Sequence, residues 1–300
     1  MEVALASALG ALRLEKLADV DAHEGPVYVA GEHALYFTTL PRELRVDVKR
    51  LDLSTGEVTS VRADANMANG MTLACDGRLL VCEQGTMAAP ARIAALDPQT
   101  GETETVVDNW RGLPLNSPND VVVADDGALW FTDPSYGFLH GFRPQPQSGD
   151  YVYRHDPATG ETSVAADSFD KPNGLAFSPG GGVLYVGDSG ANHEAGSYDP
   201  TRPHHLIAFD VVESRRLESA RLLAVTTPGF PDGLKVGRDG RVYASAFSGV
   251  QIFAPDGRLL REIDLPGAVN FAFGADERTL FITTDTAVWA AELEPEGASR

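Results

Sequence analysis

SPNDVVVADDGALWFTDP, the run of residues 117–134, carries the strongest structural signal in this 300-residue chain. It contains an alternating apolar stretch, then Asp-Gly, then a second stretch rich in aliphatic and aromatic residues. Asp-Gly between two such stretches favours a β-hairpin, because both residues tolerate the positive φ of a tight turn. Asn119 stands just before the first stretch. The run therefore predicts two antiparallel strands with a polar side chain at the start of the first.

This arrangement recurs along the whole chain at intervals of roughly 50 residues, which is typical of a repeat architecture. The second strands of the six copies are expected within residues 32–38, 76–83, 126–133, 181–188, 239–247 and 276–284. The polar residues at the starts of the six first strands are Glu24, Asn69, Asn119, Asn173, Asp232 and Asn270. One polar position shared by every copy indicates one structural unit that is used six times.

Further hairpins with Thr-Gly-Glu or Asp-Gly at their tips give about four short strands per unit, as in the blades of a propeller. The sequence thus predicts an all-β fold, a six-bladed β-propeller that forms a single domain over residues 1–300. The sixth unit is short after Trp289, so we expect the N-terminal segment around residues 11–20 to pair with the last blade and close the ring. A β-sandwich would not explain the recurring polar position.

The recurring polar residues are candidates for a central metal site. The first strand of each propeller blade lines the central channel, so the side chains at its start are expected to face the axis. Two carboxylates and four amides suit a hard divalent cation, with Ca²⁺ or Mg²⁺ favoured and Mn²⁺ or Zn²⁺ as alternatives. The competing interpretation is that Asn-Gly and Asp-Gly are simply turn formers. Agreement among all six copies, and the presence of Glu24, favour the metal site.

Four motifs resemble the gluconolactonase and senescence-marker (regucalcin-like) family of six-bladed propeller hydrolases. They are LNSPNDVVVADDGALWFTDPSYG at 115–137, KPNGLAFSPGGGVLYVGDSG at 171–190, PDGLKVGRDGRVYAS at 231–245 and NGMTLACDGRLLVCEQG at 69–85. The resemblance implies one catalytic divalent cation, most readily Ca²⁺, with the ligands Glu24, Asn119, Asn173 and Asp232. It also implies that Asp232 doubles as the general base.

The resemblance gives the other ring residues a supporting role. Asn69 and Asn270 become substrate contacts or supports of the metal ligands, and Tyr136 becomes a residue of the substrate pocket. Asp188, at the end of its strand, is expected either to bind a substrate hydroxyl or to cap the strand. The insertion at residues 190–206 is expected to be a surface loop or a lid over the channel.

The sequence departs from the family pattern at two positions. Animal members carry an arginine where this chain has Ser117, so the chain looks more like the bacterial and fungal branch of the family. Many bacterial members carry a histidine where this chain has Gln84, which argues against a mechanism that needs a histidine at that position.

The implied function is hydrolysis of a sugar lactone by a metal-dependent, gluconolactonase-like carboxylic ester hydrolase. The cation would polarise the lactone carbonyl and Asp232 would take a proton from the attacking water. The alternative is a phosphotriesterase of the diisopropyl-fluorophosphatase type, which would use the same ring with Asp232 as nucleophile. A calcium-binding propeller without hydrolytic activity is a third interpretation. A relative of strictosidine synthase is disfavoured, because that enzyme lacks the ring.

The charge of the chain argues against nucleic acid and membranes as partners. A formal net charge of −19 repels phosphate backbones and anionic lipids, so we expect neither nucleic acid nor a membrane to be a partner. No run reaches the roughly 18 apolar residues of a membrane span. We expect a cytoplasmic monomer or small homo-oligomer with a small-molecule sugar lactone as substrate.

Cys75 and Cys82 are too few for a disulfide framework, and both are expected to be buried thiols.

Overall fold

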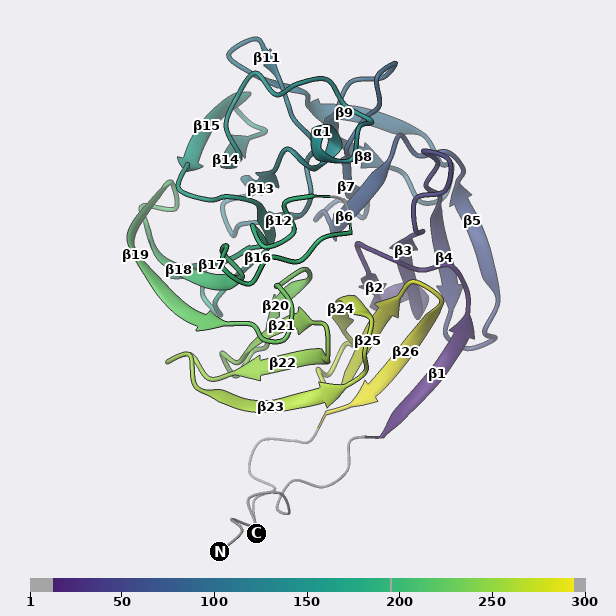
Figure 1. The fold of residues 1–300 in the computed structure, drawn as a ribbon. Helices are drawn as coiled ribbons and strands as arrows, with labels where there is room; N and C mark the ends of the chain where they lie inside the picture. The colour runs from purple at the N-terminus through teal and green to yellow at the C-terminus, as the bar shows by residue number, and fades with distance from the viewer. Residues whose placement is uncertain (1–12, 195, 294–300) are drawn as a thin grey trace, which may run out of the picture.

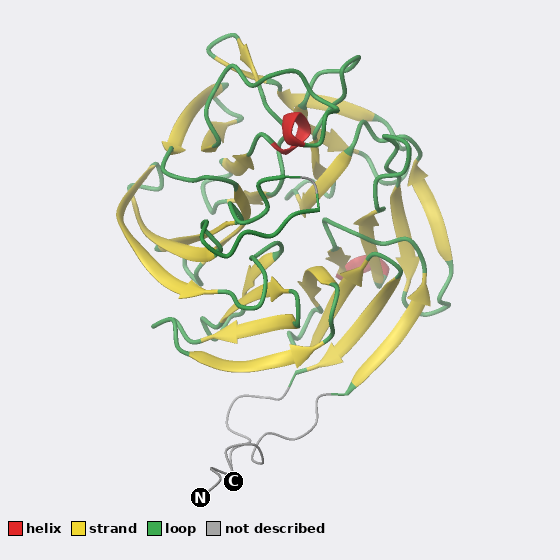
Figure 2. Ribbon diagram, in the orientation of Figure 1, coloured by secondary structure: helices red, strands yellow, loops and turns green. Residues whose placement is uncertain are grey.

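Six four-stranded antiparallel sheets surround a central axis in the computed structural model, which describes residues 13–194 and 196–293 (Figure 1). Strands dominate this part of the chain (Figure 2). Its helices are a single 3₁₀ turn, η1 (Ala30–Glu32), and one short helix, α1 (Tyr136–Leu139). The predicted all-β, six-bladed propeller is confirmed.

The first three blades follow one another along the chain, and each runs from an inner strand to an outer one. Blade 1 comprises β2 (Val27–Val29), β3 (Ala34–Thr38), β4 (Val48–Asp52) and β5 (Val58–Arg62). Blade 2 comprises β6 (Ala68–Leu73), β7 (Leu79–Glu83), β8 (Arg92–Leu96) and β9 (Thr103–Val107). After the small hairpin β10 (Asn109–Trp110) and β11 (Leu113–Pro114), blade 3 comprises β12 (Val121–Val123), β13 (Leu129–Asp133), β14 (Tyr151–Asp156) and β15 (Glu161–Ala166).

The remaining blades keep the same order. Blade 4 comprises β16 (Pro172–Phe177), β17 (Val183–Asp188), β18 (His205–Val212) and β19 (Arg216–Val225). Blade 5 comprises β20 (Leu234–Val236), β21 (Val242–Ala246), β22 (Gly249–Phe253) and β23 (Leu259–Asp264). Blade 6 comprises β24 (Ala268–Phe273), β25 (Thr279–Thr284), β26 (Ala287–Glu292) and β1 (Leu14–Asp19). The inner strands β2, β6, β12, β16, β20 and β24 surround the axis (Figure 1).

The N-terminal strand closes the ring, as the sequence predicts. β1 pairs antiparallel with β26, from Leu14 opposite Ala291 to Asp19 opposite Ala287. Residues 11 and 12 of the expected closing segment lie outside the described residues. Because the last blade is built from both ends of the chain, main-chain hydrogen bonds join the two ends and cover the edge that β26 would otherwise expose.

The hydrophobic core lies between the blades. Each pair of neighbouring blades encloses one apolar cluster, such as Trp130, Leu175 and Leu184 between blades 3 and 4. Second strands such as β13 are buried along their whole length, because a neighbouring blade covers each face, whereas outer strands such as β9 expose several side chains. Packing on both faces therefore explains why the second strands read as continuous apolar runs.

The hairpin tips follow the expected Asp-Gly chemistry. Gly77 and Gly127 have φ angles of 88° and 82°, which a side chain would disfavour. The prediction that both cysteines are buried is wrong for Cys75, which is exposed beside the first of these turns, whereas Cys82 is buried in β7. No helix in the described residues has the length and apolar character required to span a membrane.

Candidate active site in the central channel

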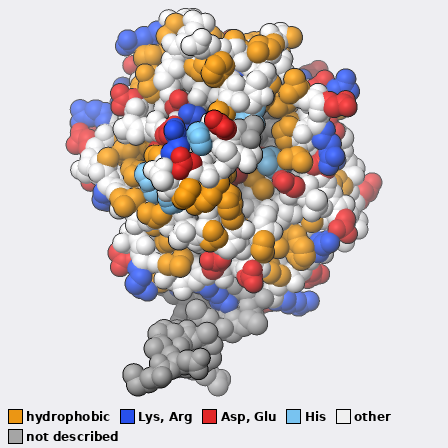
Figure 3. All heavy atoms as spheres, viewed as in Figure 1, with side chains coloured by type: hydrophobic (Ala, Val, Ile, Leu, Met, Phe, Trp, Pro, Cys, Tyr) orange, Lys and Arg blue, Asp and Glu red, His pale blue; other side chains and the backbone are white. Residues whose placement is uncertain are grey.

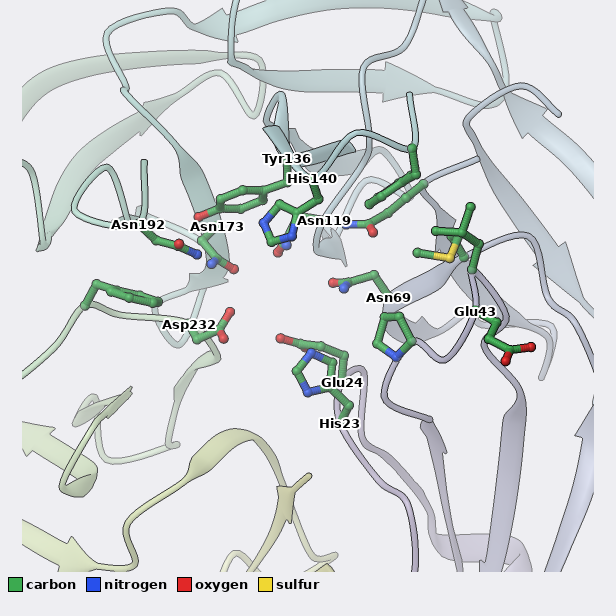
Figure 4. A pocket seen from close by; sticks show the side chains of 16 residues that line it. His23, Glu24, Glu43, Asn69, Asn119, Tyr136, His140, Asn173, Asn192 and Asp232 are labelled. Atoms are coloured by element: carbon green, nitrogen blue, oxygen red, sulfur yellow. The ribbon is translucent and has the colours of Figure 1, made fainter. Parts of the chain in front are cut away.

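The inner strands surround a cavity of about 400 Å³ at the centre of the propeller. The side chains of Glu24, Asn119, Asn173 and Asp232 line it, each contributed by a different blade, and their polar ends point toward one another (Figure 4). Glu24, Asn119 and Asn173 are buried, and Asp232 is partly exposed. The structure therefore brings together the four residues that the resemblance implies as metal ligands.

Backbone contacts between blades hold these residues in place. The Gly174 N–H donates to the carbonyl oxygen of Asp232 (3.1 Å), and the Gly70 N–H donates to that of Asn119 (2.8 Å). A Cβ atom at Gly174 would lie 2.3 Å from the Asp232 oxygen. The glycine that follows Asn173 is thus required for close approach of the next blade, not for a turn. The turn-former interpretation fails here, since Asn173 lies inside β16.

Burial and mutual repulsion dominate the electrostatics of the site. Desolvation, followed by the charge of Asp232, raises the pKa of Glu24 to about 8. Burial also raises the pKa of Asp232, although the nearby His23 opposes the shift. Neither carboxylate pairs with a lysine or arginine among the described residues. Two desolvated carboxyl groups without a full positive counter-charge therefore favour either protonation or a bound cation.

Further polar side chains line the same cavity. Asn69 and Gln84 line the cavity, and so do Tyr136 and His140 from α1 and the residue that follows it. The Tyr136 hydroxyl is buried and forms no hydrogen bond within the described residues. Burial, and next the charge of Asp232, raises its pKa well above 10, so the hydroxyl keeps its proton. It is therefore available as a donor to a bound molecule.

Asn270 and Asp188, for each of which substrate contact was one of two expected roles, form hydrogen bonds with other groups of the protein. Asn270 does not line the cavity; its Nδ2 donates to Glu24 Oε2 (2.7 Å), which makes it a support of that carboxylate. Asp188 does not line the cavity either, and its carboxylate accepts hydrogen bonds from the backbone N–H groups of Asp170 and Lys171. Of the two expectations for Asp188, substrate contact and cap, the contacts match the cap.

The cavity-lining residues that sequence reasoning did not single out include His23, Asn192 and Phe230. His23 lies beside Glu24, and its Nδ1 is 2.8 Å from Asp285 Oδ1. Burial alone would lower the pKa of His23, but the Asp285 hydrogen bond and the charges of Glu24 and Asp232 raise it overall. Asn192 comes from the 190–206 insertion, and Phe230 from the loop before β20. Adjacency to Glu24 was a signal for His23. Asn192 belongs to the insertion that was expected to be a surface loop or a lid over the channel, whereas no motif pointed to Phe230.

The residues present fit a divalent cation. The four inward side chains offer carboxylate and amide oxygens, which hard cations prefer. A dication would also compensate the two carboxylates that otherwise repel each other. No group of three or more His, Cys, Asp or Glu side chains in the described residues could hold a metal ion. A cation at this site would therefore need the amide oxygens of Asn119 and Asn173 as ligands. Figure 3 shows histidine side chains near the centre of the face viewed along the axis.

The fold and this cavity define a six-bladed propeller with an oxygen-rich central pocket. Residues 22–286 match the family described as SMP-30/Gluconolactonase/LRE-like region, so the chain belongs to that family.

The relatives agree with this membership. A gluconolactonase of Zymomonas mobilis is 32% identical over 88% of this chain and 76% of the relative. The lactonohydrolase oryL of Aspergillus oryzae is 31% identical over 86% of this chain, which spans 64% of that relative. A solved gluconolactonase from Xanthomonas campestris superposes with a TM-score of 0.82 at 33% identity, covering 98% of this chain and 94% of the other. The expected family and lactonase class are confirmed.

Proposed function

We propose that this protein hydrolyses a sugar lactone with the help of one divalent cation, Ca²⁺ in the first instance. The observation that carries the proposal is the convergence of Glu24, Asn119, Asn173 and Asp232 at the centre of a cavity of about 400 Å³. Pockets of roughly this size enclose small ligands. The gluconolactonase relatives support a neutral lactone as the substrate.

The residues of the chain would divide the reaction among them. The cation, held by the four oxygen donors, would act as a Lewis acid on the lactone carbonyl. Asp232 takes a proton from the attacking water, a role typically worth about 10² to 10⁴ in rate. Water adds to the carbonyl carbon, the ring C–O bond breaks, and the departing alkoxide takes up a proton to give the free hydroxy acid. Tyr136 and Asn69, which line the cavity, would donate hydrogen bonds to substrate oxygens.

The phosphotriesterase alternative would use the same four residues, with the Asp232 carboxylate attacking phosphorus. The ring of oxygen donors does not separate the two reactions. The lactonase names of the relatives favour the lactone, and a direct comparison of substrates tests the choice.

The test is an assay of acid release by EDTA-stripped protein on glucono-, xylono-, galactono- and arabinono-lactone. Ca²⁺, Mg²⁺, Mn²⁺ and Zn²⁺ are added back one at a time, and diisopropyl fluorophosphate is tested in parallel. We expect turnover of at least one lactone to return with a metal, and Asp232→Asn and Glu24→Gln to remain folded but inactive. Full activity in either variant, or metal-restored turnover of the organophosphate alone, would refute the proposal.

A further inference from the structure

The second strands of blades 3 and 4 both end in a buried aspartate. Asp133 ends β13 and Asp188 ends β17, with exposed fractions of 0% and 3%. Neither lines the central cavity. A carboxylate removed from water is costly unless hydrogen bonds satisfy its oxygens, so the partners of these two groups matter.

Asp133 binds the loop that leads to Asn119. Its Oδ2 accepts from the Asn116 N–H (2.9 Å), and its Oδ1 accepts from the Ser117 N–H (2.8 Å). These amides lie three and two positions before Asn119, and Pro118 stands between them and the candidate ligand. Because proline fixes φ, the backbone between the two bound amides and Asn119 has little conformational freedom, and the contacts of Asp133 restrict where Asn119 lies.

Asp188 repeats this arrangement one blade later. Its Oδ2 accepts from the Asp170 N–H (3.0 Å), and its Oδ1 accepts from the Lys171 N–H (2.9 Å). These amides again lie three and two positions before a candidate ligand, Asn173, and Pro172 again intervenes. Two independent blades thus use the same atoms in the same register.

An aspartate that accepts hydrogen bonds from two backbone N–H groups occurs in the two blades whose candidate ligand is an asparagine side chain. Blades 1 and 5 contain Glu24 and Asp232. There the positions equivalent to Asp133 and Asp188 hold Thr39 and Ala246, neither of which is acidic. A carboxylate ligand is drawn to a cation by its charge, whereas an amide oxygen contributes only if it already points at the cation. Preorganisation therefore matters most for Asn119 and Asn173.

Blade 2 provides an internal comparison. Glu83 ends β7 at the equivalent position, but its carboxylate accepts from the side-chain Nδ2 of Asn66 (2.9 Å) and from Arg92 Nε (2.7 Å). The polar residue of this blade, Asn69, is outside the proposed ligand set. Blade 2 lacks a proposed metal ligand. The acidic side chain at the end of its second strand does not bind two backbone amides within the described residues.

We propose that Asp133 and Asp188 are positioning residues, which hold the Asn119 and Asn173 loops in metal-binding geometry through the backbone that precedes each ligand. The inference rests on the proposed metal site. It predicts that loss of either grip weakens cation binding directly. Outer partners of metal ligands typically contribute about 10- to 100-fold in metal affinity or activity.

The test uses the full chain with Asp133→Asn and Asp188→Asn, which preserve volume but replace one acceptor oxygen with an NH₂ group facing an N–H. Calcium affinity is measured by isothermal titration calorimetry, and the thermal midpoint is measured in EDTA. We expect Kd for Ca²⁺ to rise roughly 10- to 100-fold in folded protein, with lactone turnover returning at excess Ca²⁺ and KM for lactone unchanged. Glu83→Gln is the matched control and should keep the wild-type Kd, even if it unfolds at a lower temperature.

Four outcomes would overturn the proposal. One is a Kd within about twofold of wild type in both folded aspartate variants; another is a raised KM for lactone that excess Ca²⁺ does not restore, which would indicate substrate contact. If a variant does not fold, amide hydrogen exchange of metal-free wild type decides. Protected Asn116, Ser117, Asp170 and Lys171 amides support the grip, and exchange as fast as at an exposed turn refutes it. Wild type that binds Ca²⁺ without hydrolysing a lactone refutes only the proposed reaction, whereas wild type that binds no cation refutes both.

Discussion

Asn270 Nδ2 donates a hydrogen bond to Glu24 Oε2 over 2.7 Å, and this contact joins the last blade of the propeller to the first. The amide cannot turn away easily, because its own Oδ1 accepts from the Phe271 N–H (2.7 Å). Both residues are buried. The contact between blades 6 and 1 therefore also orients one of the two carboxylates of the candidate metal site.

Asn270→Ala is accordingly expected to weaken cation binding without unfolding the propeller. The substitution removes the donor that orients Glu24, and loss of such a partner typically costs about 10- to 100-fold in metal affinity. Calorimetric titration with Ca²⁺ measures the effect. Asn109→Ala, at an exposed hairpin far along the chain, serves as control and should bind Ca²⁺ as wild type does. Wild-type affinity in Asn270→Ala would show that the hydrogen bond does not support the site.

Gly174→Ala tests the close approach of blades 4 and 5. The added Cβ would lie 2.3 Å from the Asp232 carbonyl oxygen, so one blade must shift. We expect the free energy of unfolding to fall by about 1–3 kcal/mol, as is usual for overpacking. Gly182→Ala is the matched control in the same blade, because its Cβ would meet no atom within 4 Å. Urea unfolding compares the two, and an equal, small effect of both substitutions would contradict the steric argument.

The fold could be predicted from the sequence because each blade repeats the same polar-apolar-turn pattern. Six copies define the number of blades, and the short sixth unit pointed to closure by the N-terminal segment. Asn-Gly was the ambiguous element, since the pair is common in turns. The sequence does not show that the glycine at 174 faces the carbonyl of residue 232 in the next blade, because that contact exists only after the ring has closed.

The candidate site was less accessible from the sequence. The four inward residues followed from their places in the repeat together with the family resemblance. The role of Asp188 did not, because a sequence shows which residues carry oxygens but not which oxygens are already occupied by backbone N–H groups. Asn192 and Phe230 lie in irregular loops, whose paths depend on tertiary contacts and not on a periodic pattern.

Tyr136→Phe is expected to reduce lactone turnover with little effect on the fold. The hydroxyl is buried at the cavity and forms no hydrogen bond within the described residues. Loss of one hydrogen bond to substrate, about 0.5–1.5 kcal/mol, corresponds to a roughly 2- to 13-fold lower kcat/KM.

Tyr153→Phe is the matched control for this prediction. Its hydroxyl is likewise buried and without a hydrogen bond in the described residues, but it belongs to the core between blades 2 and 3. Steady-state kinetics should show wild-type kcat/KM for Tyr153→Phe and a loss for Tyr136→Phe. The same change in both variants would mean that the Tyr136 hydroxyl does not contact substrate.

Glu24→Gln should be more stable than wild type without metal and less stable than wild type with bound Ca²⁺. In the metal-free state burial and the charge of Asp232 raise the pKa of Glu24 from 4.5 to about 8. Between these two values the folded protein holds a proton that the unfolded chain has released, so the free energy of unfolding falls as the pH rises through this interval. Glutamine has no proton to lose. Metal-free Glu24→Gln is therefore expected to be more stable than metal-free wild type at pH 8.5, with the difference shrinking toward pH 5.

Saturating Ca²⁺ should reverse that order, because a ligand that binds only the folded state stabilises it by RT ln(1 + [L]/Kd) and the variant lacks a charged ligand. Urea unfolding at pH 5, 6.5 and 8.5, with EDTA or with Ca²⁺, measures both effects. Parallel pH profiles for wild type and variant in EDTA would refute the burial of an uncompensated Glu24. An equal gain from Ca²⁺ in both proteins would refute its role as a ligand. Asp133 carries a raised pKa of about 7 in both proteins, so its contribution to the pH dependence cancels in the comparison.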